Sequence, residues 1–233
     1  MKQLYRSEAK LAFTMIELVF VIVVLGILAA MAMPRVERDL RQEAADNILS
    51  AIRYTQHLAL MDNVVDPTNL SWQQKFWSFG KSGCSDNGIY YYIASDTDMD
   101  AGIGIDVEEA AIDAANGGWM NGVNGAPCEA TLAGQVFADG TRPSKNIFLT
   151  KKYGIIEDDA TMFGSCAGAT TYIGFDYLGR PHGGFADSGS PNYSSILAAD
   201  CNLTFSFQDG SPNLVITIKK ETGYAFIVGQ PNS

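Results

Sequence analysis

Three carboxylates at alternate positions are the first residues of this sequence with the spacing of a ligand-binding loop. Asp96, Asp98 and Asp100 precede Gly102, as do the oxygen ligands in loops that bind hard cations such as calcium. An EF-hand loop has glycine at its sixth position and glutamate at its twelfth, whereas here Gly102 is seventh and Glu108 is thirteenth. A structural calcium ion held by the three aspartates is one interpretation, and a solvated acidic loop is the other.

Residues 164–168, Gly-Ser-Cys-Ala-Gly, have the form of a nucleophile elbow with Cys166 in the place of serine. Catalysis by this thiol requires a base, and the only histidines are His57 and His182. His57 falls on a predicted helix and His182 in a predicted turn. The sequence therefore predicts no catalytic residue, and Cys166 is expected to form a disulfide.

Glu17 is the only residue between Phe13 and Met33 that can carry a charge. About 20 apolar residues cross a hydrocarbon core, so this run predicts a membrane-spanning helix. An ionised carboxylate in lipid costs at least about 2.5 kcal/mol and is expected to have a partner. A cut just before Phe13 would create an α-amine within one helical turn. That amine could pair with Glu17 of the same chain or of a neighbouring subunit, and so set the register of a filament.

The charges on either side of the apolar run predict its orientation. Lys2, Arg6 and Lys10 outnumber Glu8 in the first twelve residues, which indicates a cytoplasmic N-terminus and an exported remainder. The formal net charge of −10 argues against binding to nucleic acid or anionic lipid. Two alternatives remain open: a secretory signal cut after Ala32, or a plain signal anchor with Glu17 near the membrane interface.

Four cysteines lie in the segment that is predicted to be exported, where disulfides are expected. The sequence permits three pairings of these residues. We favour Cys84–Cys128 with Cys166–Cys201 because each closes a local loop. Four free buried thiols would be expected if the segment were not exported.

The pattern of apolar residues predicts the elements of the chain. A helix is expected from Phe13 to Met61, with Pro34 kinking or loosening it and an apolar stripe after Pro34. A small helix is expected at residues 107–115. Strands are expected at residues 89–93, 136–138, 146–150, 171–176, 203–207, 214–218 and 224–228.

The expected fold class is α+β, with the long N-terminal helix packed on an antiparallel β-sheet head. The expected parts are a cytoplasmic leader (1–12), a membrane-spanning helix (13–34), its amphipathic continuation (35–62) and a β-rich globular head (63–233).

Residues 13–35, Phe-Thr-Met-Ile-Glu-Leu-Val-Phe-Val-Ile-Val-Val-Leu-Gly-Ile-Leu-Ala-Ala-Met-Ala-Met-Pro-Arg, resemble the N-terminus of type IV pilins and of the pseudopilins of type II secretion. The match consists of phenylalanine at the mature start, glutamate at the fifth position, glycine at the fourteenth and proline at the twenty-second. These are Phe13, Glu17, Gly26 and Pro34. Residues 44–60, 175–181 and 216–223 are similar to H-type minor pseudopilins and FimT-like minor pilins.

The resemblance implies a type IV pilin-like fold and a defined processing path. A prepilin peptidase would remove the leader between Ala12 and Phe13 on the cytoplasmic side and N-methylate Phe13. Ala12 stands where the family has glycine, which predicts slower cleavage. The partners implied are other pilin-like subunits and an inner-membrane assembly platform with its ATPase.

The function expected from the resemblance is that of a minor pilin or pseudopilin that assembles through its N-terminal helix and is not an enzyme. It would wait in the bacterial inner membrane with its head in the periplasm, then join a type II secretion pseudopilus or a type IV pilus. The alternative is a membrane-anchored periplasmic binding protein that does not polymerise. A secreted thiol enzyme, released by the cut after Ala32, is a further rival and requires a free Cys166.

Overall fold

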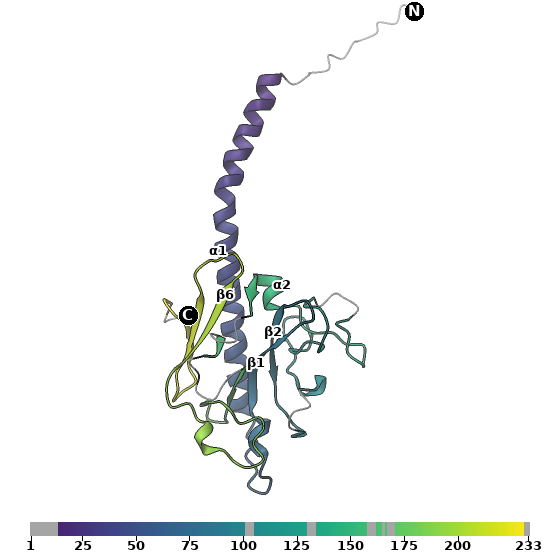
Figure 1. The fold of residues 1–233 in the computed structure, drawn as a ribbon, viewed down its shortest axis with the longest axis vertical. Coiled ribbons are helices and arrows are strands. Elements are labelled where there is room, and N and C mark those ends of the chain that lie inside the picture. Colours follow the sequence, from purple (N-terminus) through teal and green to yellow (C-terminus); the bar gives the residue numbers. More distant parts are fainter. Residues whose placement is uncertain are drawn as a thin grey trace, which may run out of the picture. The chain divides into compact units, whose positions relative to one another are not determined.

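The computed structural model describes residues 14–100, 105–129, 134–157, 162–164, 166 and 171–230 (Figure 1). Within α1, it describes no side chain between residues 30 and 39. The predicted leader, the cleavage site at Ala12 and Phe13, and the side chain of Pro34 lie outside the described residues. The chain divides into two compact units, one up to Leu40 and the other from Arg41 onward.

The first element, α1, extends from Met15 to Met61 and ends where the sequence predicted. Its backbone is helical through Pro34. Among the residues that the structure describes, no helix combines the length and the apolar character needed to cross a membrane.

The second unit contains two four-stranded antiparallel sheets, with the strand orders β2-β1-β4-β5 and β3-β6-β7-β8. The first sheet is built from β1 (Trp77–Gly83), β2 (Ile89–Ala94), β4 (Tyr172–Phe175) and β5 (Pro181–His182). The second is built from β3 (Ile155–Ile156), β6 (Cys201–Phe207), β7 (Leu214–Ile218) and β8 (Ala225–Ile227). The short helices are η1 (Trp72–Lys75), η2 (Val107–Glu109), α2 (Leu149–Tyr153) and η3 (Tyr193–Ser195).

One face of α1 in this unit packs against both sheets (Figure 1). Ala44, Ile48 and Ile52 are fully buried and share one core with residues of both sheets. The apolar stripe expected after Pro34 was predicted to include Leu40, but Leu40 is 42% exposed and the buried residues begin at Ala44. The α+β class is confirmed as an N-terminal helix, over residues 40–61, packed against antiparallel β-structure. The single sheet that we expected is wrong, because the strands form two sheets.

Several predicted elements differ from the structure. Residues 146–150 were expected to form a strand, but α2 begins at Leu149. This helix ends at Gly154, whose φ of +68° and N–H bonds to the carbonyls of Leu149 and Thr150 form a C-cap. Residues 136–138 form no strand, and the helix expected at 107–115 is limited to η2. It stops because Ala110 pairs with Ala94 in an isolated β-bridge.

Gln56 connects α1 to one turn of each sheet. Its side-chain amide donates to the carbonyl of Gly179, between β4 and β5, at 2.9 Å. The same amide nitrogen donates to the carbonyl of Thr222, between β7 and β8, at 2.7 Å. Gly223 follows Thr222 with a φ of +65°, and a Cβ there would overlap the Gly179 carbonyl oxygen. The two sheets are therefore held to the helix at a point where their turns touch.

Replacing Gly223 with alanine should test this junction against a matched control, Gly210→Ala. Both glycines have positive φ, but a Cβ at Gly210 meets nothing within 4 Å. The left-handed conformation costs each variant about 1–2 kcal/mol. Gly223→Ala should lose about 2 kcal/mol more, because the added methyl group overlaps backbone. Urea unfolding of the full chain in non-ionic detergent measures the difference, and equal losses would show that the close approach at Gly223 contributes nothing.

Candidate functional site

Every large apolar side chain of α1 between Met15 and Leu28 is exposed. The exposed fraction ranges from 37% for Val24 to 85% for Met15. Because these residues occupy nearly every position over several turns, they cover the whole circumference of the helix. An exposed apolar surface of this kind marks contact with lipid or with another protein.

Glu17 and Thr14 bond to each other at the start of this helix. The Thr14 hydroxyl oxygen accepts from the Glu17 N–H at 3.3 Å, and the Glu17 carboxylate accepts from the Thr14 N–H at 3.5 Å. This reciprocal pair is a capping box, which satisfies two of the N–H groups that a helix start leaves without partners. The box was not predicted, although the Thr-x-x-Glu spacing that signals it is present in the sequence.

Gly26 has open space around it in the described structure. A Cβ added at Gly26 would meet no atom of the chain within 4 Å, apart from the backbone of its own helix turn. Contacts with the described residues therefore give no reason for glycine at this position. A close approach by another molecule would supply one.

All four cysteines form disulfides, in the two pairs that were favoured from the sequence. The Cα atoms are 5.3 Å apart in Cys84–Cys128 and 4.6 Å apart in Cys166–Cys201. Cys166 therefore has no thiol with which to attack a substrate. The thiol-enzyme alternative loses its nucleophile.

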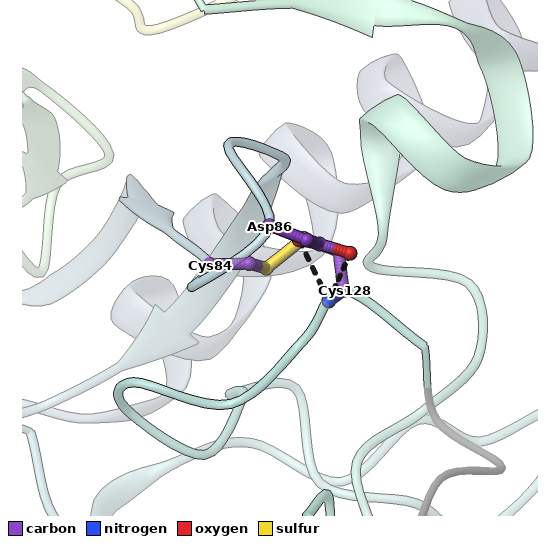
Figure 2. Close-up of side chains that lie close together, drawn as sticks. All are labelled: Cys84, Asp86 and Cys128. Atoms are coloured by element: carbon purple, nitrogen blue, oxygen red, sulfur yellow. Dashed lines mark hydrogen bonds between the residues drawn. A yellow bond between two sulfur atoms is a disulfide. The ribbon is translucent and has the colours of Figure 1, made fainter.

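Asp86 lies beside the first disulfide, and Figure 2 shows the three side chains together. Possible ligand atoms of Cys84, Asp86 and Cys128 lie within 4.8 Å of one another, a grouping that could suggest a metal site. Both sulfur atoms are already bonded to each other, so neither is the thiolate that such a site requires. The Asp86 carboxylate instead accepts from the Cys128 N–H, at 3.1 and 3.2 Å.

The predicted calcium ligands lie in a loop that its own carboxylates organise. Oxygens of Asp96, Asp98 and Glu109 lie within 4.8 Å of one another, and Asp100 is outside this group. Glu109 is 6% exposed, and its two oxygens accept from the N–H groups of Thr97, Asp98 and Asp106 at 2.6, 3.3 and 3.0 Å.

With one oxygen from each, the three carboxylates supply fewer than the six to eight oxygen ligands that calcium prefers. Burial and, to a smaller extent, the charges of Glu109, Asp100 and Asp98 raise the pKa of Asp96 to about 6, against a hydrogen bond from the Met99 N–H that lowers it. The loop is therefore a compact negative site, and calcium binding there stays a prediction.

Asp176, His182 and Ser195 form a buried chain of hydrogen bonds that was not predicted from the sequence. His182 Nε2 lies 3.3 Å from Asp176 Oδ2, and His182 Nδ1 lies 2.8 Å from Ser195 Oγ. All three residues are 3% exposed, and Asp176 and His182 line a cavity of about 220 Å³. Ser195 Oγ also donates to the carbonyl of Asn192 at 2.6 Å. The chain therefore ties the β4–β5 turn to η3 and lacks the geometry of an activated nucleophile.

Asp176 also closes its own turn. Its carboxylate accepts from the N–H groups of Leu178 and Arg180, at 3.0 and 2.8 Å, and from the Arg180 guanidinium. These bonds explain the Asp-x-x-x-Arg-Pro-His spacing of residues 176–182 in structural terms.

Comparisons with protein-family models, curated proteins and solved structures find no match for this chain. The resemblance of residues 13–35 to type IV pilins and pseudopilins therefore stays a basis for proposal. The features available for a functional argument are the exposed apolar helix, the capping box at Glu17 and the disulfide-bonded head.

The pKa of Asp176 predicts a loss of stability in acid. Burial alone would raise this pKa, but hydrogen bonds from His182 and Arg180 outweigh it and lower the pKa from 3.8 to about 2. A lowered carboxyl pKa stabilises the folded state above pH 4, and this contribution disappears as the pH falls from 4 to 2. It amounts to about 2 kcal/mol. In Asp176→Asn the free energy of unfolding should lose this part of its pH dependence, whereas Glu108→Gln, at an exposed position, should retain it.

Removing the first disulfide should destabilise the head. Cys84 and Cys128 are 44 residues apart, and opening a loop of this size costs about 2–4 kcal/mol. The double variant Cys84→Ser, Cys128→Ser should still fold, with both ends of the loop packed as before. It should unfold at a lower urea concentration. An unchanged unfolding midpoint would indicate that the bond adds nothing to stability.

Proposed function

We propose that this chain is a minor pilin-like subunit that assembles through its N-terminal helix into a type II secretion pseudopilus or a type IV pilus. The observation that carries the proposal is the exposure of every large apolar side chain from Met15 to Leu28. A helix that is apolar on all sides requires apolar surroundings on all sides. Lipid supplies them before assembly, and the helices of other subunits supply them in a filament.

Glu17 fits the same proposal. The capping box with Thr14 holds its carboxylate at the first turn of the helix, next to the position of Phe13 in the chain. Cleavage before Phe13 would create a positive amine one residue before Thr14. The carboxylate could then pair with this amine in the same subunit, or with the amine of a neighbour that enters the filament beside it.

The proposed location follows from the leader charges and the disulfides. A basic leader favours a cytoplasmic N-terminus. Two disulfides in the second unit favour an oxidising compartment for the head. We therefore assign the subunit to the bacterial inner membrane, with one span, a periplasmic head and later incorporation into the filament.

The proposed activity is polymerisation, with no catalytic step. The partners would be other pilin-like subunits, a prepilin peptidase that cuts between Ala12 and Phe13, and an inner-membrane assembly platform with its ATPase. A membrane-anchored binding protein that displays its head singly is the alternative. It requires neither cleavage at Phe13 nor contact between helices of different subunits.

Mass spectrometry of the N-terminus, on protein from membranes of its own host, tests the processing step. The proposal expects a mature chain that begins with N-methylated Phe13. An intact Met1 would favour the singly displayed binding protein, and a start at Met33 would favour a secreted form.

Glu17→Gln and Gly26→Leu test assembly itself. Both should leave the subunit folded and membrane-bound, because Glu17 is exposed and Gly26 has open space around it. Both should reduce incorporation into sedimentable filaments at least about tenfold, since assembly couplings of about 1.4 kcal/mol or more correspond to that factor. Glu108→Gln on the head serves as the charge-matched control for Glu17→Gln. Normal filament yield from both helix variants would contradict the proposal.

A further inference from the structure

The outer face of the first sheet carries a groove that the filament proposal does not use. Cross-strand partners share a face, so Ser78, Gly80 and Ser82 of β1 lie on the same side as Tyr90 and Tyr92 of β2. This is the face opposite to Phe79, Ile93 and Ile173, which belong to the core shared with α1. The central strand therefore presents only small side chains between aromatic neighbours.

These small residues give the groove its shape. The Tyr92 ring lies over Gly80, where a Cβ would overlap it, and the Phe185 ring covers Gly174 in the same way. Two cavities, of about 540 and 270 Å³, lie next to each other and share Tyr92 and Ile105 in their walls. We refer to the two adjoining cavities together as the groove.

The walls of the groove combine tyrosines with acidic groups. Tyr92 lines both cavities, Tyr172 lines the smaller one, and Tyr90, which is only 2% exposed, lies in the wall of the larger one. The carboxylates that line the two cavities are Asp96, Asp100, Asp106 and Asp187. Lys81 is the only basic residue among the described residues of these walls, and it already pairs with Glu157 at 2.9 Å. The groove is therefore negative and rich in aromatic rings.

We propose that this groove binds an extended segment of a partner polypeptide that carries lysine or arginine side chains. Cationic side chains can lie against tyrosine faces and pair with the carboxylates of the groove. Both the rings and the carboxylates would then contact the bound segment. Ser78, Ser82 and Asn121 also line the groove, with the Ser78 hydroxyl donating to the Phe76 carbonyl and the Asn121 amide to the Ile105 carbonyl. The net charge of −10 would also attract a basic segment from a distance.

Other occupants would use only part of this chemistry. A neutral oligosaccharide could stack on the tyrosines and donate hydrogen bonds to the carboxylates, but it carries no positive charge to balance the four of them. A calcium ion could bind the carboxylates but has no use for the rings. The inference rests on residues of the second unit alone and does not depend on assembly of the N-terminal helix.

Fluorescence anisotropy with a labelled peptide, Gly-Arg-Gly-Lys-Gly-Arg-Gly, tests the proposal on the full chain in non-ionic detergent. A chelator excludes calcium. The peptide should bind, and its affinity should fall as salt rises. The same peptide with glutamate in place of each basic residue should not bind. Absence of binding by the basic peptide, or binding of a neutral oligosaccharide in its place, would overturn the proposal.

Two charge-matched double variants locate the binding surface. Asp100→Asn with Asp187→Asn removes two carboxylates from the groove and should weaken binding about three- to tenfold. Asp200→Asn with Asp209→Asn makes the same change in net charge at exposed residues outside the groove walls and should have little effect. Equal weakening by both pairs would mean non-specific attraction and would overturn the proposal.

Tyr92→Ala tests the contribution of the rings and should weaken binding about fivefold or more. Thermal unfolding checks that Tyr92→Ala remains folded. If Tyr92→Ala does not fold, the two asparagine double variants decide whether the groove binds the peptide. Glu17→Gln should leave peptide binding unchanged, so failure of the groove and failure of the filament proposal give different results.

Discussion

The head depends on a single helix face that serves as core for two sheets at once. Ala44, Ala51 and Ala59 alternate along α1 with Ile48 and Ile52, and all five are at most 3% exposed. Alanine allows the backbones of neighbouring strands to come close, while isoleucine fills the space between them. The core residues of both sheets meet on this helix face. Each sheet therefore buries its apolar face against the same helix. Gln56 extends the arrangement beyond the apolar region, since its amide joins one turn from each sheet.

The two parts of α1 require different surroundings for their apolar side chains. From Met15 to Leu28 it is apolar around its whole circumference and is exposed. From Ala44 to Ala59 only one face is apolar, and that face is buried. The apolar face of the second part is buried by residues of the same chain. The apolar side chains of the first part can be buried only by other molecules. For this reason the proposed function depends on the first part and not on a pocket.

The sequence predicted well those elements whose periodicity is local. The end of α1, the strands β6, β7 and β8, and the glycine turns between them follow from alternation and turn chemistry within short windows. It failed at β1, which contains two glycines and two serines and has low strand propensity. β1 is a strand because β2 and β4 flank it and because its small residues leave room for Tyr92 and Phe185, which lie far away in sequence. The division into two sheets is equally non-local.

The candidate sites show the same division between local and distant information. The Asp96 spacing drew attention to this loop, but the residue that organises it is Glu109, whose carboxylate accepts from N–H groups at both ends of the loop. Glu109 is the fourteenth position counted from Asp96, whereas the EF-hand spacing used for the prediction has its glutamate at the twelfth. Because Glu109 uses its oxygens on the backbone, its charge is held in place next to Asp96 and Asp98 and cannot turn away to solvent. The loop thereby keeps a concentrated negative charge at the edge of the tyrosine-lined face. A positively charged side chain next to Asp96 and Asp98 would reduce the repulsion among these carboxylates.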